Sequence, residues 1–287
     1  MDASRPIRTV AVLGSGTMGA GIAEVCALRG FETVLYDLTP EIAAAGLERI
    51  HASIQKGVDR GKTSPNVAAA AMGRLRTTAR LEDCAGADLV IEAAPEDPAI
   101  KRDLFQRVAA VVGERALIAT NTSSLSVSGL AGAVPRPKRF LGLHFFNPPV
   151  LMRLVEVIAG DRTAPETLAA GEAFARALGK TPVSVRDTPA FIVNRVARPF
   201  YGEALRLLGE QAAPAGTIDA LMRSAGFKMG PFELMDLIGL DVNFAVTQSV
   251  YHAFFEDPRY RPHPIQRRMV EAGQLGRKTG RGFYEYN

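Results

Sequence analysis

A glycine-rich turn near the start of the chain constrains the fold more than any other feature. Residues 8–13 (RTVAVL) form a short β-rich apolar run, residues 14–19 (GSGTMG) follow at once, and residues 20–29 have helical spacing. A second apolar run, residues 33–36, ends in Asp37, which lies 18 residues after the third glycine. Strand, glycine turn, helix, strand and acid in this order predict a βαβ unit that binds a dinucleotide at the turn.

The positions of this turn have distinct physical roles. The first glycine permits the tight turn, the second lets the backbone approach a pyrophosphate, and the third lets helix and strand pack closely. The amino end of the helix offers N–H donors to phosphates, and Asp37 can accept hydrogen bonds from both ribose hydroxyls. The predicted cofactor-binding residues here are Gly14, Ser15, Gly16, Thr17, Met18, Gly19 and Asp37. The alternatives are a βαβ turn without a ligand, and an Asp37 that caps the next helix, for which Thr39 is better placed.

Apolar runs and helical patterns alternate after the glycine turn. They predict strands at residues 75–78, 88–92, 116–119 and 182–185, and helices at residues 41–58, 66–72, 98–112 and 165–178. Such alternation is typical of an α/β domain with a parallel sheet. The two helices between residues 41 and 74 resemble a hairpin inserted between strands. Its polar positions include Ser53, Lys56 and Arg60, and the usual meaning of such a run is a solvated face.

Residues 141–158 (LGLHFFNPPVLMRLVEVI) are where we expect the chemistry. Two apolar runs flank the turn at Asn147, and each run is predicted as a strand. The first run contains His144, and alternation places Glu156 on the apolar face of the second. A buried carboxylate needs a partner, and one bonded to a histidine ring leaves the other ring nitrogen free to take a proton. The alternative is a core histidine and a strand-edge glutamate that never meet.

Two loops are predicted to lie beside the glycine turn. Glu96 follows the strand at 88–92, and Ser123 follows the strand at 116–119. Loops after the carboxyl ends of parallel strands face the ligand crevice. A simpler role for Ser123 is the N-cap of a helix.

The pattern changes after Asp187-Thr188-Pro189, which is typical of a boundary. The segments after it are predicted as helices at residues 191–209, 217–224, 232–237, 241–255 and 264–272. We therefore predict an α/β domain at residues 1–187 and an all-α domain at residues 188–287. The basic, glycine-rich segment 275–283 is either a loop that returns to an anion or a solvated tail.

Composition excludes several classes of function. The net charge is only +4 and no dense Lys/Arg block occurs, which argues against a nucleic-acid partner and allows a small polyanion. The four histidines lack metal-ligand spacing, so no metal is expected. No apolar run is long enough for a membrane span, and the first begins near Ile7, which leaves no room for a signal peptide. Two cysteines without CxxC spacing fit a reducing compartment, and we expect a cytoplasmic protein.

The motifs together resemble a known family. GSGTMGAGIA, VIEAA, NTSSL, LHFFNPP with LVEVI, TPAFIVNR, MGPFEL, DLIGLD and LGRKTGRGFY occur in that order. This chain closely resembles the L-3-hydroxyacyl-CoA dehydrogenases, in particular the bacterial short-chain members, the 3-hydroxybutyryl-CoA dehydrogenases. The resemblance spans essentially the whole chain, and HFFNP with the downstream VEV is its most specific part.

The resemblance implies a Rossmann-type NAD-binding domain followed by a helical domain that forms much of a homodimer interface. It implies His144 as the catalytic histidine, Glu156 as its partner, and Ser123 and Asn194 as contacts of the reacting end of the substrate. The implied NAD contacts outside the glycine turn are Glu96, Lys101, Ser123, Asn147 and Lys278. The implied contacts of the CoA substrate are Ser53, Lys56, Arg60, Ser123 and Asn147.

The expected function is therefore NAD-dependent interconversion of short (S)-3-hydroxyacyl-CoA and 3-ketoacyl-CoA thioesters, as in fatty acid β-oxidation. One alternative is a related dehydrogenase of a free sugar acid, for which a thioester handle at Ser53 and Arg60 would be useless. Another is a non-catalytic NAD- or CoA-binding protein. The presence of His144, Glu156, Ser123 and Asn194 together argues against it.

Overall fold

The protein is described from a computed structural model that covers residues 6–286. The chain divides into two compact units, one up to Thr188 and one from Pro189 onward. The division lies one residue beyond the predicted boundary. Within residues 6–286, the helices are all too short or too polar to cross a membrane.

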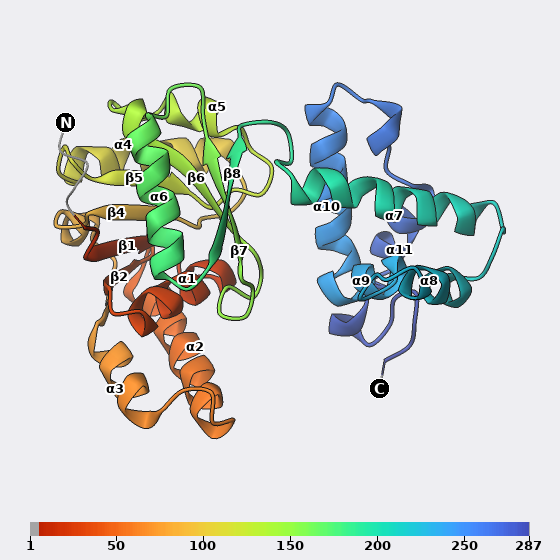
Figure 1. The fold of residues 1–287 in the computed structure, drawn as a ribbon, viewed down its shortest axis with the longest axis horizontal. Helices are drawn as coiled ribbons and strands as arrows, with labels where there is room; N and C mark the ends of the chain where they lie inside the picture. Colours follow the sequence, from red (N-terminus) through yellow and green to blue (C-terminus); the bar gives the residue numbers. More distant parts are fainter. Residues whose placement is uncertain (1–5, 287) are drawn as a thin grey trace. The chain divides into compact units, whose positions relative to one another are not determined.

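The first unit is built on one eight-stranded sheet (Figure 1). Its strands are β1 (Thr9–Leu13), β2 (Glu32–Tyr36), β3 (Leu75–Thr78), β4 (Leu89–Glu92), β5 (Leu117–Thr120), β6 (Phe140–Phe145), β7 (Leu154–Ala159) and β8 (Thr181–Arg186). They lie in the order β3-β2-β1-β4-β5-β6-β7-β8. All neighbours are parallel except β6 and β7, which form an antiparallel pair. The α/β domain predicted from the alternating runs and the Rossmann-type fold implied by the resemblance are both confirmed.

Helices cover both faces of this sheet. They are α1 (Thr17–Leu28), α2 (Pro40–Asp59), α3 (Pro65–Gly73), α4 (Pro98–Val111), α5 (Val127–Ala131) and α6 (Pro165–Ala177), with 3₁₀ turns η1 (Leu81–Cys84) and η2 (Pro137–Arg139). Phe174 of α6 shares one core with Leu141 of β6. Phe105 of α4 packs edge-to-face on the adjacent Phe140, with ring centroids 4.9 Å apart. Successive strand residues point to opposite faces, so the continuous apolar runs are explained by burial on both sides.

Helix caps decide two alternatives left open by the sequence. Thr39 is the N-cap of α2 and its hydroxyl accepts from Ile42 N at 3.3 Å, so Asp37 is not the cap. The short helix α5 was not predicted, and its N-cap is Ser126. Ser123 therefore lies in the loop before the helix and does not cap it.

The second unit is helical, as predicted. It comprises α7 (Val193–Gly209), α8 (Ala215–Ser224), α9 (Pro231–Ile238), α10 (Leu240–Ala253) and α11 (Pro264–Glu271), with 3₁₀ turns η3 (Pro258–Tyr260) and η4 (Arg277–Thr279). The prediction that the first helix begins at Phe191 is wrong, because Ala190 and Phe191 have φ of 63° and 55°. The prediction that the fourth extends to Phe255 is wrong for the same reason, since its φ is 51°. These are left-handed conformations, which a right-handed helix excludes.

The basic segment after α11 folds back onto the helical unit. The backbone N–H groups of Phe283 and Tyr284 each donate to the Asp236 carboxylate at 3.0 Å. The hydroxyl of Tyr284 donates to Asp219 at 2.7 Å and that of Tyr286 to Asp236 at 2.9 Å. The basic segment is therefore not a solvated tail. It returns to the carboxylates of Asp219 and Asp236, which belong to the same unit.

Candidate active site

The glycine turn joins β1 to α1 with the geometry a pyrophosphate requires. Gly14 has φ of +101°, which side chains other than glycine rarely adopt. A Cβ atom on Gly19 would lie 1.7 Å from the Gly14 carbonyl oxygen, so only glycine permits this packing. A Cβ on Gly16 would meet nothing within 4 Å, and the space beside the amino end of α1 is open. The turn therefore fits a phosphate group against free backbone.

Asp37 is tied to this turn from the end of β2. Its Oδ2 accepts from both the backbone N and the hydroxyl of Ser15 at 2.7 Å, and its Oδ1 accepts from Leu38 N at 2.8 Å. Ser15 itself is fully buried. A carboxylate fixed in this position is suited to accept ribose hydroxyls at the entrance to the turn.

A buried ion-pair network supports the Ser123 loop. The Lys101 ammonium is fully buried and lies 2.5 Å from Glu92 Oε1 and 3.3 Å from Glu96 Oε2. Glu96 Oε1 accepts from the Thr122 hydroxyl at 2.6 Å and from Ser123 N at 2.8 Å. Burial alone would raise the pKa of Glu96, but Lys101 and these donors outweigh it and lower the pKa. Glu96 is therefore a fixed anion that holds the Ser123 loop, and the Lys101 ammonium is its counter-ion.

His144 and Glu156 face each other across the antiparallel pair β6–β7. They are register partners, and His144 Nδ1 lies 2.7 Å from Glu156 Oε2. The two residues are 5% and 1% exposed, so the pair is shielded from water. Because a carboxylate can only accept, Nδ1 carries the hydrogen and Nε2 is left as the basic nitrogen. The contact expected from the sequence is present.

The end of β6 is fastened to the loop that carries Ser123. The Phe145 N–H donates to Asn121 Oδ1 at 2.8 Å, two residues before Ser123. The Phe146 ring packs against the His144 imidazole, with centroids 4.4 Å apart. Asn147 follows at once in the connection to β7. The sheet therefore holds the histidine and the serine loop as one assembly.

The predicted CoA contacts other than Ser123 and Asn147 lie on α2 and just after it. Ser53 donates to Glu24 Oε1 at 3.0 Å, so its hydroxyl already has an acceptor on α1. Glu24 is buried, and burial raises its pKa to about 7 despite this hydrogen bond. Lys56 and Arg60 are exposed near the end of α2.

The two remaining predicted residues belong to the helical unit. Asn194 lies in the first turn of α7. The Lys278 ammonium lies 2.6 Å from both carboxylate oxygens of Asp241.

Sequence reasoning missed Glu92 and Asn121, which position the site. Glu92 is fully buried at the end of β4, and it also accepts from the Thr120 hydroxyl at 2.7 Å. The signal for Glu92 was available, because it is an acid at the end of the apolar run LVIE. No comparable signal marked Asn121 among other loop amides.

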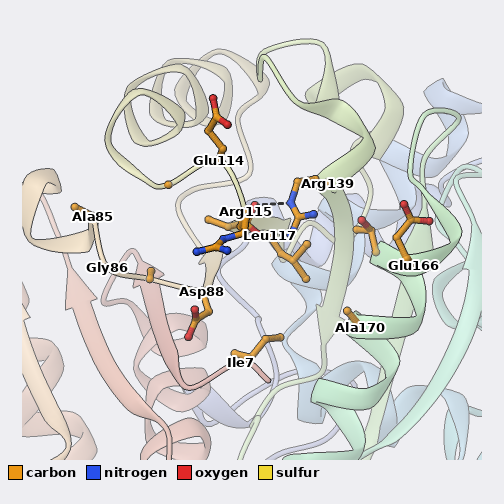
Figure 2. A pocket seen from close by; sticks show the side chains of 14 residues that line it. Ile7, Ala85, Gly86, Asp88, Glu114, Arg115, Leu117, Arg139, Glu166 and Ala170 are labelled. Atoms are coloured by element: carbon orange, nitrogen blue, oxygen red, sulfur yellow. Dashed lines mark hydrogen bonds between the residues drawn. The ribbon is translucent and has the colours of Figure 1, made fainter. Parts of the chain in front are cut away.

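A cavity of about 540 Å³ lies at the amino ends of the strands, opposite to the end that carries the glycine turn (Figure 2). It is lined by Asp88 and Leu117 at the amino ends of β4 and β5, and by Arg139 and Glu166. Ligands of open α/β sheets bind at the carboxyl ends of the strands. Size alone therefore does not make this cavity the active site.

Comparison with known proteins agrees with this geometry. Residues 9–188 match the family model described as "3-hydroxyacyl-CoA dehydrogenase, NAD binding domain", and residues 191–286 match "3-hydroxyacyl-CoA dehydrogenase, C-terminal domain". The chain is 47% identical to the 3-hydroxyadipyl-CoA dehydrogenase of Escherichia coli over 98% of its own length, and this match spans 59% of that relative. It is 43% identical to the 3-hydroxybutyryl-CoA dehydrogenase of Bradyrhizobium diazoefficiens, over 98% of this chain and 96% of the relative.

A solved structure shows the same fold. The crystal structure of (S)-3-hydroxybutyryl-CoA dehydrogenase from Ralstonia eutropha superposes with a TM-score of 0.93 at 41% identity. The match covers 98% of this chain and 99% of that one.

Proposed function

The chain belongs to the 3-hydroxyacyl-CoA dehydrogenase family, and from this premise we propose that it interconverts (S)-3-hydroxyacyl-CoA and 3-ketoacyl-CoA thioesters. NAD is the proposed hydride carrier, and 3-hydroxybutanoyl-CoA is the proposed short-chain substrate. The observation that carries the proposal is the buried 2.7 Å hydrogen bond between His144 and Glu156. It gives the site one basic nitrogen of fixed orientation, as a general acid–base requires.

The proton steps follow from this geometry. In oxidation, His144 takes the substrate's hydroxyl proton at Nε2, because Nδ1 is held by Glu156. Bound NAD supplies the acceptor for the hydride that leaves C3. Glu156 keeps the tautomer and stabilises the imidazolium that forms. In reduction, the same imidazolium returns the proton to the oxygen on C3.

Ser123 and Asn194 are the proposed contacts of that oxygen. Ser123 suits the role because its backbone N–H donates to Glu96 Oε1 at 2.8 Å. Glu96 is in turn held by an ion pair with Lys101. Asn194 lies in the first turn of α7, and its proposed role rests on the family resemblance.

The proposed handle for CoA is the exposed pair Lys56 and Arg60. CoA carries a 3′-phosphate and a diphosphate, and exposed cations attract such groups in a salt-dependent way. Ser53 contributes less directly, since its hydroxyl donates to Glu24. Lys278 and Asn147 remain proposed NAD contacts.

We further propose a cytoplasmic homodimer formed through the helical unit. That unit carries exposed apolar side chains on α8, α9 and α10, among them Leu221, Leu237 and Val242. Such side chains are buried from water when two copies pack together. Light scattering on the purified chain tests this directly, and a monomer at micromolar concentration would contradict it.

The activity is tested by NADH oxidation with acetoacetyl-CoA, by NAD+ reduction with a free sugar acid, and by a control reaction without thioester. We expect turnover with acetoacetyl-CoA alone. His144→Ala should lose about a hundred- to ten-thousandfold in kcat while NADH still binds, as followed by its fluorescence. Turnover of the sugar acid, or an active His144→Ala variant, would overturn the proposal.

A further inference from the structure

A buried arginine in the helical unit has only neutral partners. Arg198 on α7 is 5% exposed. Its Nη1 donates to the Asn243 carbonyl at 3.0 Å and to the Thr247 hydroxyl at 2.9 Å, and its Nε donates to the Asn194 carbonyl at 3.2 Å. Its guanidinium lies 4.9 Å from the centre of the Tyr201 ring. Among residues 6–286, no carboxylate lies within ion-pair distance of it.

This arrangement differs from how charge is normally buried. A buried cation is usually paired with an anion, as Lys101 is with Glu92 in the first unit. Burial lowers the pKa of Arg198 to about 10, so it stays charged at neutral pH. The uncompensated charge indicates that a counter-ion comes from outside the chain.

Arg198 also lines a small cavity. The hydrogen bonds of Arg198 are made by Nε and Nη1, and none involves Nη2. Asn243 Nδ2, and not Arg198 Nη2, is the fully buried side-chain atom found without a hydrogen-bond partner among the described residues. The cavity is also lined by Arg259, Arg261 and His263, and no acid contributes to its wall. Its volume of about 10 Å³ admits one water-sized group, such as a carboxylate oxygen.

The position of Arg198 along α7 suits the far end of a substrate. Asn194 and Arg198 are four residues apart, one helical turn, which is about 6 Å along the axis and on one face. In an extended six-carbon dicarboxylic chain, an oxygen of the terminal carboxylate lies about 5 Å from C3, given C–C bonds of about 1.5 Å. The E. coli relative is named for such a chain, since 3-hydroxyadipyl-CoA carries a free carboxylate at C6.

We propose that Arg198 binds the terminal carboxylate of a dicarboxylic 3-hydroxyacyl-CoA substrate, with Arg259 and Arg261 adding positive charge at the cavity. The proposal rests on the function proposed above and on Asn194 contacting the oxygen at C3. The carboxylate accepts from Nη2 and supplies the missing counter-charge. A charge-assisted hydrogen bond of this kind corresponds to about ten- to a hundredfold in affinity.

The decisive measurement compares three substrates in the NADH oxidation assay. They are 3-oxoadipyl-CoA, 3-oxohexanoyl-CoA, which has the same length without the carboxylate, and acetoacetyl-CoA. All three carry CoA, so contacts with its phosphates cancel in the ratios. For the wild type we expect kcat/KM about ten- to a hundredfold higher for 3-oxoadipyl-CoA than for 3-oxohexanoyl-CoA, mainly through KM. Equal kcat/KM values of the wild type for these two substrates would by themselves overturn the inference.

Variants locate the effect. Arg198→Met should collapse the ratio through a higher KM for 3-oxoadipyl-CoA, and Arg198→Lys should restore part of it. If Arg198→Met does not fold, the exposed Arg261→Gln should lower the ratio by a smaller factor. Arg267→Gln is the matched control, because it removes one exposed charge on α11 that pairs with Glu271. An unchanged ratio in folded Arg198→Met would overturn the inference.

Two other outcomes are distinguishable. Absence of turnover with all three thioesters would contradict the proposed function itself. Free adipate that raises the Tm of the wild type but not of Arg198→Lys, with unchanged substrate ratios, would assign a separate anion site and overturn the substrate assignment.

Discussion

The two units of the molecule treat buried charge in opposite ways. In the sheet unit, the strand carboxylates Glu92 and Glu156 are each paired with a side chain that can carry positive charge, Lys101 at 2.5 Å and His144 at 2.7 Å. In the helical unit, Asp219 and Asp236 are equally buried, but no cation lies within ion-pair distance of either among residues 6–286. Their partners are backbone N–H groups and tyrosine hydroxyls.

The difference teaches which carboxylates can take part in chemistry. A carboxylate bonded to a histidine influences where that ring carries its proton, so it acts on reactivity. A carboxylate surrounded by amide N–H groups has partners that do not titrate near neutral pH, so it acts on shape. We therefore expect equal burial to serve catalysis in the sheet unit and closure of the fold in the helical unit.

Exchanging the acid for its amide in the sheet unit should give the largest effect. We expect Glu156→Gln to lower kcat about a thousandfold, or about 4 kcal/mol, because the amide no longer favours the Nδ1–H tautomer or the imidazolium. Steady-state rates with acetoacetyl-CoA measure this, and Asp236→Asn is the matched control. If both variants kept kcat within twofold per folded molecule, the distinction between the units would be lost.

In the helical unit the corresponding loss should be in stability. Asp236→Ala leaves the N–H groups of Phe283 and Tyr284 and the Tyr286 hydroxyl without their acceptor. We expect a loss of about 3 kcal/mol and faster proteolysis of the segment after η4. Glu285→Ala removes an exposed acid from the same segment and serves as the control. Equal proteolysis of the two variants would show that Asp236 does not hold the segment.

Glu24 is the exception in the sheet unit, since its one described hydrogen-bond partner is the uncharged Ser53. Its pKa is raised from 4.5 to about 7, chiefly by burial. Its contribution to stability is fully present below its unfolded pKa and is lost as pH rises through about 7. Glu24→Gln cannot titrate, so we expect it to be more stable than wild type by roughly 2 kcal/mol at pH 8 and by little at pH 4. Tm values at the two pH values test this, and a pH-independent difference would contradict it.

The smallest expected effect concerns Asp37, the half-exposed acid that follows β2. It should favour NADH over NADPH by at least about tenfold in kcat/KM, or about 1.4 kcal/mol, because a ribose phosphate would face its negative charge. No cation follows in Leu38, Thr39 and Pro40 to reverse this preference. Asp37→Ser should narrow the gap, and an unchanged ratio would refute the assignment.

Features encoded by local patterns were predictable from the sequence. The apolar runs identified the strands, and the glycine turn identified the dinucleotide motif. The contact of Glu156 with His144 followed because an acid on an apolar face needs a partner. The contact is present at 2.7 Å, while its catalytic role stays a prediction.

Features that depend on tertiary contacts were not predictable. Neither Ala190 nor Phe191 is a residue that favours positive φ, so nothing local indicated where α7 begins. The partners of Asp236 lie 47 to 50 residues beyond it. Tyr284, one of the partners of Asp219, lies 65 residues beyond that acid. No periodicity reports contacts at such separations.

Those separations bear on how the chain folds while it is being made. His144 meets Glu156 only 12 residues later, and both belong to a unit that precedes the helical one along the chain. Asp236 instead waits 50 residues for Tyr286, which at a synthesis rate of 5–20 residues per second is roughly 3 to 10 s. Until the last residues have been made, the Asp236 carboxylate lacks these hydrogen-bond donors and the helical unit cannot complete its packing. Nascent chains stalled before residue 283 should therefore hold a folded sheet unit beside a helical unit that proteases and chaperones still recognise.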